Sequence, residues 1–456
     1  MRKQHKKLVV ILLIGLISGI AVKWNSIEDY WLLSRRFEKP EDRNGAWEQD
    51  LNYLKSDYLR VCRSFGKNAS EEFYSEVDFI LNSINTLTDN QILVKLIHAV
   101  ALADDAHTNV KYKFLPKAGI RMAWFEEGLY VIKTSSSYND HLGNRINRVN
   151  GLAIDAIRTA LYDYIPGNDY NKKQSLSGLI IRPDFWNGIS TTYNSDYLIV
   201  EMVDSTGMMQ IDTIGIETIT STLINLYWDN LPDTVFIKYK KPFDNLPLYL
   251  SSPYKAALYQ SLTDKSIYIL VNSSSNKGID LKEFAKTLKD ELDSEVYENI
   301  IYDIRLNSGG SYNLSRKIED LIINEIAESA GHLYLITGNQ TASSAINSAA
   351  TLKHHLGEHM TIAGEPVGDN LIFWAEPKIF RLPNSGLQIS APIYQHDLQN
   401  DRFIPFKTNW GNLFWSFASG GLDVDVPVEV SIHDYINYED PVMARVLELI
   451  ENENDK

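Results

Sequence analysis

The pattern of apolar and polar positions changes twice along the chain and divides it into three regions. Between residues 44 and 106, apolar residues recur every three or four positions, which predicts amphipathic helices packed on one another. From about residue 112 to residue 250, short alternating runs such as 129–133 and 197–203, separated by turn residues, predict a β-rich region. From residue 266 onward, predicted strands and helices alternate.

The third region has the order of a parallel α/β sheet. Nearly continuous apolar runs predict strands that are covered on both faces, and amphipathic stretches between them predict helices. The predicted strands are 267–271, 300–304, 333–336 and 361–363, and the predicted helices are 281–292, 311–329 and 341–356. Such an order predicts right-handed crossovers and a mostly parallel sheet with helices on its faces. Catalytic loops in sheets of this kind lie at the carboxyl ends of the strands.

The first residues predict the compartment. A basic stretch at residues 2–7 precedes an uncharged run at residues 8–22, which Lys23 ends. As a helix this run is about 22 Å long, shorter than the ~30 Å hydrocarbon core of a bilayer. It fits either a cleaved signal peptide or a short uncleaved membrane anchor. Both place the rest of the chain outside the cytoplasm, as a membrane-anchored or secreted protein in a periplasmic or extracellular space.

Composition and charge remove several classes of function. The 456 residues carry 44 basic and 59 acidic side chains, a net charge of −15, so we expect no nucleic-acid partner. The single cysteine, Cys62, excludes a disulfide framework and a cysteine-rich metal site. No dinucleotide fingerprint, Walker loop or GxSxG elbow is present, and the cluster of His354, His355 and His359 lacks metal-site spacing. We therefore expect neither a cofactor nor a metal.

The first segment with chemical potential follows a predicted strand and reads Asp303-Ile-Arg-Leu-Asn-Ser-Gly-Gly310. The pair Gly309-Gly310 can adopt backbone geometries closed to other residues, and its N–H groups could face an anion. A simple turn is the alternative interpretation. Asp303 and Arg305 lie two residues apart on one side of the strand, which predicts a structural ion pair.

The second segment, Thr341-Ala-Ser-Ser-Ala345, opens a predicted helix. A serine on the first turn of a helix lies beside unpaired N–H groups and the positive end of the helix dipole, which would stabilise an oxyanion. The alternative is that Thr341, Ser343 or Ser344 caps the helix. The packing face of this helix is predicted to consist of Ala345, Ala349, Leu352 and Leu356.

The third segment, Asp104-Asp-Ala-His-Thr108, ends the helical region. A histidine near an exposed loop can act as the general base for a serine. His107 is one of ten histidines, so its position alone does not single it out. From the residues alone, a secreted hydrolase with a serine at a helix N-terminus is one candidate among several.

In this order, the segments resemble those of the tail-specific (C-terminal processing) serine peptidases, including their tricorn-core-like branch. The resemblance runs from about residue 47 to residue 450. Segments at 382–386 and 440–441 also recur in this family. The motifs that carry the resemblance are Asp105-Ala-His-Thr108, the strand and loop 301–310, Thr341-Ala-Ser-Ser-Ala345 and Gly364-Glu-Pro-Val-Gly368.

The resemblance implies a fold with several parts. The fold would be an α/β catalytic core with a ClpP/crotonase-like β-α-β sheet, preceded by a helical N-terminal domain and a β-rich PDZ-like module. Residues 142–151 are similar to the end of such a module, although its usual carboxylate-binding loop is not evident. The expected divisions are a signal peptide or anchor at 1–24, the helical domain at 44–111, the PDZ-like module at 112–250, the peptidase core at 251–436 and a C-terminal helix and tail at 437–456.

The resemblance also implies roles for single residues. Ser343 would be the nucleophile, and the amides of Ser344, Gly309 and Gly310 would form the oxyanion hole. The family's processing peptidases use a lysine as the base, but that position is Asn370 here, and an amide cannot accept the serine proton near neutral pH. The tricorn-like branch uses the earlier histidine, so His107 is the expected base. The acid that orients it is left open among Asp105, Glu365, Asp397 and Asp401.

The expected function is an exported serine peptidase that cleaves polypeptides through an acyl-enzyme. Two departures favour an alternative, a catalytically inactive peptide- or lipid-binding protein on the same fold. Ile346 stands where many relatives carry a glutamate, and a late Pro-Asp motif is altered at residues 426–428. A lipid or small-ester hydrolase is a third and weaker expectation.

Overall fold

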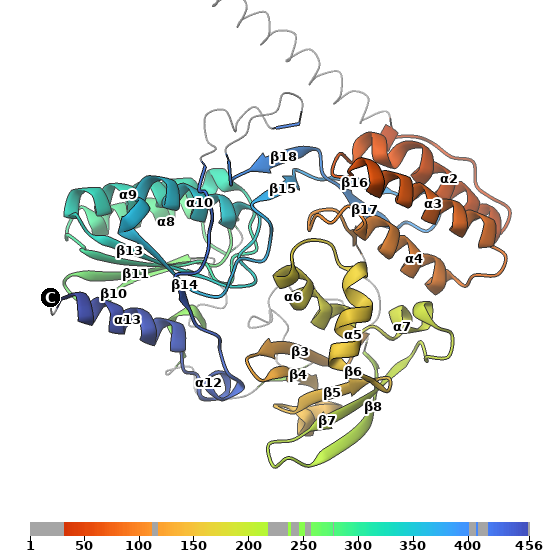
Figure 1. The fold of residues 1–456 in the computed structure, drawn as a ribbon, viewed down its shortest axis with the longest axis horizontal. Coiled ribbons are helices and arrows are strands. Elements are labelled where there is room, and N and C mark those ends of the chain that lie inside the picture. Colours follow the sequence, from red (N-terminus) through yellow and green to blue (C-terminus); the bar gives the residue numbers. More distant parts are fainter. Residues whose placement is uncertain are drawn as a thin grey trace, which may run out of the picture. The chain divides into compact units, whose positions relative to one another are not determined.

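A computed structural model (Figure 1) gives the fold of the chain as two compact units. Unit 1 comprises residues 1–112, 372–397 and 401–416, and unit 2 comprises residues 113–371, 398–400 and 417–456. The expected leader at residues 1–24 lies outside the described residues. Within the described part of the chain, no helix is both long enough and apolar enough to cross a membrane. The structure describes residues 32–111, 117–217, 236–238, 246–250, 257–276, 278–400, 407–408 and 418–454.

Unit 1 contains the predicted N-terminal helices. They are α2 (Arg43–Val61), α3 (Lys67–Ser83) and α4 (Asp89–Ala101). Asp42 caps α2 by accepting a hydrogen bond from the Gly45 amide at 2.7 Å, and Thr88 forms a capping box with Gln91 at the start of α4. The apolar stripes predicted from the sequence form the buried faces of these helices.

Late segments of the chain complete unit 1. The short sheet β1-β17-β16 joins the residue after the helices to a distant hairpin, and β15 pairs with β18. This sheet makes polar and apolar contacts with α2. The Tyr58 hydroxyl donates to the Ser390 carbonyl at 2.8 Å, and the rings of Phe380 and Tyr53 stack with their centroids 4.4 Å apart. The strands are β1 (Val110–Lys111), β15 (Ile372–Ala375), β16 (Lys378–Arg381), β17 (Gln388–Ala391) and β18 (Tyr394–Asp397).

This grouping differs from the expected division, which placed residues 372–397 in the peptidase core. The physical reason lies in α2 and its carboxylate Asp50, which is fully buried. Asp50 accepts hydrogen bonds from the backbone amides of Asn384 and Ser385, both at 2.8 Å. The segment at 382–386 that recurs in the family is therefore the turn that docks on α2.

The β-rich part of unit 2 is an antiparallel sheet of order β2-β8-β7-β5-β4-β3, to which β6 and β9 add. The strands predicted at 129–133 and 197–203 lie in β4 and form β7. The strands are β2 (Lys117–Ala118), β3 (Ile120–Phe125), β4 (Gly128–Ser135), β5 (Arg145–Val149), β6 (Leu152–Ala153), β7 (Tyr197–Val203), β8 (Met209–Glu217) and β9 (Phe236–Lys238). The α-helices are α5 (Ile154–Leu161), α6 (Asp169–Leu179) and α7 (Pro183–Ile189).

The second sheet of unit 2 confirms the predicted α/β order. Its strands follow the order β10-β11-β12-β13-β14-β19, and all pair in parallel except β10, which is antiparallel to β11. Every residue of β11 and β12 is buried, as their continuous apolar runs predict. The strands are β10 (Ala257–Ser261), β11 (Ser266–Val271), β12 (Asn299–Asp303), β13 (His332–Thr337), β14 (Met360–Gly364) and β19 (Val426–Pro427).

Helices cover both faces of this sheet (Figure 1). One face carries α8 (Leu281–Leu292), α9 (Tyr312–Ser329) and α10 (Ser344–Leu356), and the other carries α13 (Pro441–Asn454). The predicted packing face of α10 is buried. A short helix, α12 (Ile432–Asn437), precedes α13. Among the residues that the structure describes, 3-10 segments lie at Ser136–His141, Tyr162–Tyr164, Leu248–Leu250 and Gly357–His359.

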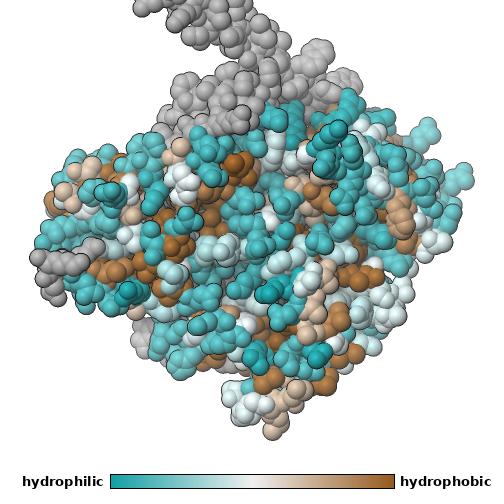
Figure 2. Space-filling view, in the orientation of Figure 1, coloured by the Kyte–Doolittle hydropathy of each residue, from teal (hydrophilic) through white to brown (hydrophobic). Residues whose placement is uncertain are grey.

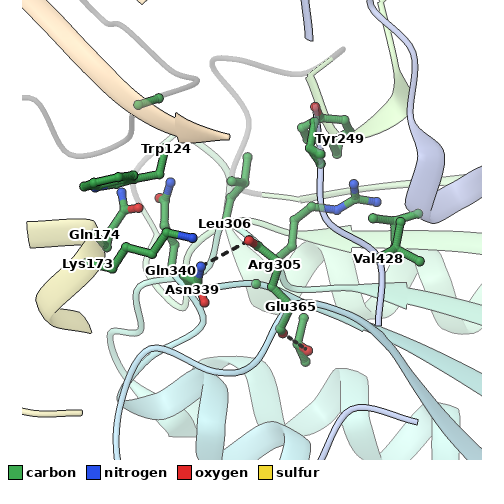
Figure 3. A pocket seen from close by; sticks show the side chains of 15 residues that line it. Trp124, Lys173, Gln174, Tyr249, Arg305, Leu306, Asn339, Gln340, Glu365 and Val428 are labelled. Atoms are coloured by element: carbon green, nitrogen blue, oxygen red, sulfur yellow. Dashed lines mark hydrogen bonds between the residues drawn. The ribbon is translucent and has the colours of Figure 1, made fainter. Parts of the chain in front are cut away.

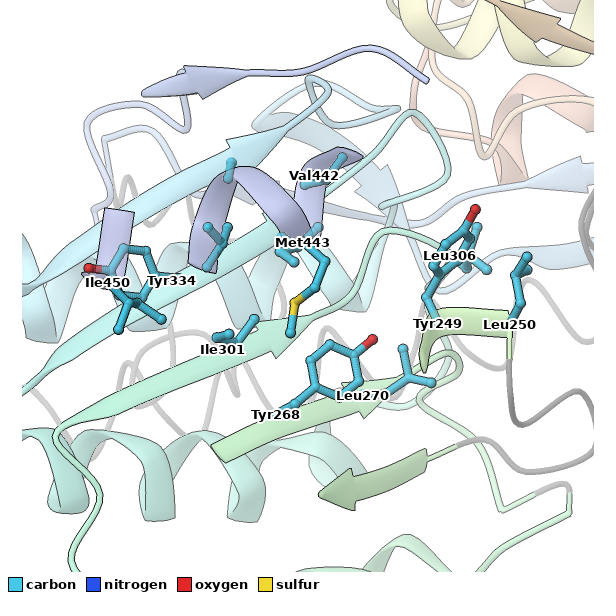
Figure 4. Close-up of a cluster of buried hydrophobic side chains, with 13 residues drawn as sticks. Tyr249, Leu250, Tyr268, Leu270, Ile301, Leu306, Tyr334, Val442, Met443 and Ile450 are labelled. Atoms are coloured by element: carbon cyan, nitrogen blue, oxygen red, sulfur yellow. The ribbon is translucent and has the colours of Figure 1, made fainter. Parts of the chain in front are cut away.

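The contact of α13 with the sheet forms an apolar core (Figure 4). Met443 and Ile450 of α13 point toward Tyr268, Ile301 and Tyr334, which are register partners on the adjacent strands β11, β12 and β13. Each of these three sheet residues is at most 1% exposed. Burial at this level contributes roughly 1.5–3 kcal/mol for each large apolar side chain. The core therefore holds the strand ends, where the candidate site lies, on a rigid base.

Hydrophilic residues predominate on the face of the molecule in Figure 2. In the described part of unit 2, the β7–β8 hairpin carries three large apolar side chains that are each more than half exposed, Met208, Met209 and Ile211. Single exposed apolar residues are common on protein surfaces and need no function.

Candidate active site

Ser343 occupies a strained position between the loop after β13 and helix α10. Its backbone has φ 56° and ψ −123°, a conformation that L-residues rarely adopt and that typically costs ~1–3 kcal/mol. Ser343 stands at the N-cap of α10, yet its side chain accepts no hydrogen bond from the first turn of the helix. The capping alternative therefore does not explain this residue. Its side chain is partly exposed, as a nucleophile requires.

The loop before Ser343 is tied to the loop after β12. The hydroxyl group of Thr341 donates to the Ile304 carbonyl at 2.9 Å and accepts from the Gly338 amide at 3.0 Å. The Ala342 amide donates to the Asn307 carbonyl at 3.1 Å. Thr341 is fully buried, so its role is to join the two loops rather than to cap the helix.

The pair Gly309-Gly310 makes two close backbone approaches. At Gly309, with φ +101°, an added Cβ would lie 2.7 Å from the Cβ of Ser343 and 3.2 Å from its Oγ. At Gly310, with φ +138°, a Cβ would lie 2.3 Å from the Ser274 carbonyl oxygen. Both positions therefore require glycine, and Gly309 is the residue that admits the Ser343 side chain.

The predicted oxyanion donors differ in how their N–H groups are used. The Gly309 amide donates to Oδ1 of Asn307 at 2.9 Å, so this group is engaged in the structure. For the amides of Gly310 and Ser344, no acceptor is found among the described residues. These two donors stand on either side of the Ser343 loop, after β12 and at the first residue of α10.

The predicted ion pair between Asp303 and Arg305 is present and has a third member. The Arg305 guanidinium contacts Asp303 at 2.8 Å and Asp440 at 2.9 Å, and all three side chains are at least nine-tenths buried. Tyr268 donates to Oδ2 of Asp303 at 2.8 Å, and Arg305 contacts the same oxygen. Asp440 precedes α13, so this network anchors that helix to the end of β12. The sequence marked Asp440 as part of a recurring segment but did not give its partner.

His107 lies in unit 1, on the loop between α4 and β1. Its ring stacks on Phe373 with centroids 5.4 Å apart, and Phe373 stacks on His396 at 5.1 Å. Burial lowers the pKa of His107 to about 4, and the nearby His396 and Lys111 act in the same direction. The imidazole is therefore neutral near pH 7 and is able to accept a proton.

Of the proposed acids, Asp105 has both oxygens engaged within unit 1. Oδ1 accepts from the Trp374 amide at 2.8 Å, and Oδ2 accepts from the Thr108 hydroxyl at 2.7 Å. Burial raises the pKa of Asp105 to about 6. The carboxylate thus holds the backbone around His107 in place.

The other three proposed acids lie in different places. Asp397 is buried at the end of β18 in unit 1. Glu365 lies in unit 2, where its Oε1 accepts from the Asn339 side chain at 3.1 Å and burial raises its pKa. Asp401 lies outside the described residues.

The structure thus brings together four of the five predicted site residues. Ser343, Ser344, Gly309 and Gly310 lie in unit 2, on the loops that follow β12 and β13. His107 belongs to unit 1. The pairing of its imidazole with the Ser343 hydroxyl therefore stays a prediction.

A pocket that sequence reasoning missed lies at the carboxyl ends of β12, β13 and β14 (Figure 3). Trp124 of β3 and Lys173 of α6 line one side, and Arg305, Asn339 and Glu365 line the other. The cavity measures about 50 Å³. No sequence signal pointed to Trp124 or Lys173, because their distance along the chain from the motifs hides their place in the fold.

The position of the family lysine lies at a second and more open cavity of about 260 Å³ in unit 2. Asn370 lines it together with Asp369, Leu422 and Asp423. The Asn370 amide N–H donates to Oδ1 of Asp369 at 2.8 Å. The described residues include no group of three or more side chains suited to hold a metal ion.

Comparisons with known proteins found similarity in structure and not in sequence. No family model matches the chain, and no curated protein matches it. Solved structures do match, and among them are CPAF, the photosystem II D1 C-terminal processing protease and an S41 protease. The structure of mature CPAF matches with a TM-score of 0.54 and 11% identity, and the match covers 87% of this chain and 95% of that chain.

Two further solved structures match the chain. Mature CPAF complexed with lactacystin has a TM-score of 0.54 and 11% identity, and the match covers 90% of this chain and 99% of that chain. The photosystem II D1 C-terminal processing protease has a TM-score of 0.35 and 11% identity, with coverage of 86% and 94%. At such low identity, the likeness to CPAF is a likeness of fold.

Proposed function

We propose that the chain is a serine peptidase that hydrolyses peptide bonds through an acyl-enzyme on Ser343. The observation that carries the proposal is the backbone of Ser343, held at φ 56° and ψ −123° at the N-terminus of α10. Strain of this kind costs stability and persists where the surrounding structure enforces it, as at nucleophiles. The neighbouring Gly309, which leaves room for the Ser343 hydroxyl, supports the same assignment.

In the proposed reaction, Oγ of Ser343 attacks the carbonyl carbon of the scissile bond while its proton passes to His107. The amides of Ser344 and Gly310 donate to the oxyanion, and each such donor typically contributes ~3–4 kcal/mol to transition-state stabilisation. The protonated His107 then gives its proton to the leaving amine. Water then attacks the resulting ester while His107 accepts its proton, and His107 returns the proton to Oγ of Ser343 as the acid product leaves. This requires units 1 and 2 to bring the two side chains within hydrogen-bonding reach.

The proposal extends to the parts of the chain and its compartment. The sheet from β10 to β19 would be a ClpP/crotonase-like catalytic core, and the sheet from β2 to β9 a PDZ-like module. The basic and apolar residues 2–22 would export the protein, as a signal or as an anchor. A polypeptide would be the substrate, as the class of the matching structures suggests.

A second function, peptide or lipid binding without cleavage, is favoured by specific residues. Asn370 replaces the family lysine, and Ile346 replaces a glutamate of the nucleophile segment. On this reading the fold is kept and the chemistry is lost.

The discriminating experiment is labelling of the full chain with a fluorophosphonate probe, which forms a covalent bond only with an activated hydroxyl. We expect labelling of the wild type, loss of labelling in Ser343→Ala, and at least a hundredfold loss in His107→Gln, in line with the ~10²–10⁴-fold that a general base contributes. Ser273→Ala, which removes a partly buried serine on the loop after β11, is the matched control and should label normally. Lactacystin, present in a structure of mature CPAF, offers a second probe.

The outcomes separate the two functions. Absence of labelling at every pH between 5 and 9, in protein shown to be folded, would overturn the peptidase and favour the binding protein. Labelling that survives Ser343→Ala would also contradict it. A panel of peptides and short esters then distinguishes a peptidase from an esterase.

A further inference from the structure

A second carboxyl group lies beneath the first turns of α10 and has no part in the proposed chemistry. Glu319 of α9 is fully buried, although glutamate is almost never buried without a charged partner. One of its oxygens, Oε1, accepts a hydrogen bond from the hydroxyl of Ser348 on α10. For the other oxygen, Oε2, no hydrogen-bond partner is present among the described residues. Helix α9 lies beside α10 on the sheet (Figure 1).

The hydrogen bonds of Ser348 depend on the protonation of Glu319. The Ser348 oxygen lies 3.2 Å from the Ser344 carbonyl and 3.3 Å from the Ser315 hydroxyl, in addition to its contact with Glu319. A hydroxyl group has only one hydrogen to donate. A neutral Glu319 can donate its own hydrogen to Ser348, which leaves the hydrogen of Ser348 for the Ser344 carbonyl. An ionised Glu319 takes that hydrogen, so the Ser344 carbonyl loses its bond from the Ser348 side chain and keeps only the helix bond from the Ser348 amide.

The surroundings of Glu319 disfavour its ionised form. The charged groups that act on it are Asp320 and Arg316 of its own helix, which oppose each other and lie 3.8 Å apart. From β12 it is faced by the buried hydroxyl of Tyr302. From α10 it is faced by the hydroxyl of Ser348, whereas His355 of that helix faces Asp320 and Arg316.

Burial without a compensating cation is costly for a carboxylate. It raises the pKa of Glu319 to about 7, whereas the nearby hydroxyl groups of Ser348 and Ser315 oppose the rise. The hydrogen-bond geometry and the charge environment therefore agree that the neutral acid is the form that fits this site.

We propose that Glu319 is a positioning residue for the reaction on Ser343, because its neutral carboxyl group, through Ser348, fixes the Ser344 carbonyl and the first turn of α10. Ionisation releases the proton to solvent and withdraws the bond from Ser344, the residue next to the nucleophile. The first turn then loosens, and the Ser343 hydroxyl and the Ser344 amide lose their alignment. This inference rests on the proposed function of Ser343.

The proposal adds a second limb to the pH dependence of Ser343. A serine and histidine pair alone becomes more reactive as the imidazole loses its proton and then stays reactive. Ionisation of Glu319 instead lowers reactivity at higher pH. The wild type is thus expected to show a maximum, and a variant with a permanently neutral group at position 319 is expected to show a plateau.

The test is the rate of fluorophosphonate labelling of the full chain between pH 5 and 9. In the wild type the rate should fall at least about fivefold from pH 7 to pH 9, the range in which one carboxyl group with a raised pKa ionises. In Glu319→Gln, which keeps the hydrogen bond to Ser348, the rate should stay constant over that range. Glu325→Gln is the matched control, since it alters a buried glutamate on the same helix whose Oε1 accepts from the Tyr297 amide at 2.8 Å. This variant should follow the wild type.

A second measurement does not depend on labelling. Hydrogen exchange of the first-turn amides of α10, corrected for the intrinsic pH dependence, should become faster above pH 7 in the wild type and not in Glu319→Gln. Should Glu319→Gln not fold, Ser348→Ala removes the same link, keeps the carboxyl group, and should abolish the high-pH fall.

Failure of the two proposals can be told apart. A wild type that never labels overturns the peptidase, while the exchange experiment still decides the role of Glu319. A wild type that labels with the same pH profile as Glu319→Gln, together with unchanged exchange of α10, overturns the role of Glu319 and leaves the nucleophile in place.

Discussion

Contacts of single residues explain why certain motif positions hold glycine or threonine. Gly309 is glycine because its missing side chain leaves room for Ser343, and Gly310 is glycine because the Ser274 carbonyl approaches it. Thr341 is threonine because its hydroxyl joins the loops after β12 and β13. The residue types in these motifs are therefore required by close packing around the Ser343 hydroxyl as well as by the proposed chemistry.

Gly309→Ala tests this packing. The added Cβ would overlap with Ser343 at 2.7 Å and would keep a positive φ, so we expect loss of fluorophosphonate labelling by at least tenfold and destabilisation of ~1–3 kcal/mol. Labelling kinetics and urea unfolding measure the two effects. Gly207→Ala is the matched control, since Gly207 has φ +85° but nothing within 4 Å of an added Cβ. It should carry the backbone cost alone and label normally.

At the scale of elements, the α/β order was predictable and the loop partners were not. The strands at 267–271 and 333–336 are predictable from their continuous apolar runs, and the helix that starts near residue 281 is predictable from its amphipathic period. Asp440 was marked only as part of a segment, because its link to Arg305 joins groups 135 residues apart. Trp124 and Lys173 gave no signal, because they reach their pocket through the fold of a different sheet.

The conformation at the start of α10 could not be predicted from the sequence pattern. Serine and threonine at a helix N-terminus predict a cap, and residues 341–344 offered three of them. The structure begins α10 at Ser344 and turns the backbone of Ser343 to a positive φ, which no periodicity reveals. A strained backbone comes from the loops packed against it and not from the local sequence.

The network that holds α13 on the sheet can be broken at one residue. Arg305→Met would leave Asp303 and Asp440 buried without their cation, so we expect destabilisation of ~3–5 kcal/mol, the usual cost of an uncompensated buried charge. Urea unfolding of the full chain measures it. Arg445→Met, which removes a surface arginine of α13 paired with Glu448, should cost under ~1 kcal/mol. Equal effects of the two variants would contradict the structural role of the network.

At the scale of the whole molecule, the chain divides its candidate site residues between two units. The loops with Ser343 and Gly309 lie in unit 2, and His107 lies in unit 1 among Asp105, Phe373 and His396. The sequence proposed site residues that follow or precede regular elements, and four of the five lie together in unit 2. The grouping of residues 372–397 with the first helices was not predictable, because it depends on contacts such as Asp50 with Asn384.

The buried imidazole of His107 predicts how the stability of unit 1 varies with pH. Its folded-state pKa of about 4 lies below the ordinary value of 6.5, so the unfolded chain binds the proton first as the pH falls. Stability due to this group is full above pH 6.5 and is lost as the pH falls toward 4. His107→Gln should remove that loss, which is on the order of 2–3 kcal/mol.

Denaturant unfolding at pH 7.5 and pH 4.5 measures the effect. The exposed His433→Gln on α12 is the control and should show the full decline of the wild type. The raised pKa of Asp105 works in the opposite direction, because its folded form holds the proton more tightly. The comparison of His107→Gln with His433→Gln isolates the imidazole, since Asp105 is present in both.

The discontinuous composition of unit 1 has a consequence for how the protein is made. Asp105 and its partner Trp374 are 269 residues apart, so the N-terminal helices leave the ribosome long before the strands that cover them. At ~5–20 residues per second, that interval is about 15–50 s. During this interval the apolar face of α2, which includes Tyr58, is exposed on the nascent polypeptide. We therefore expect chaperones to bind this stretch during translation.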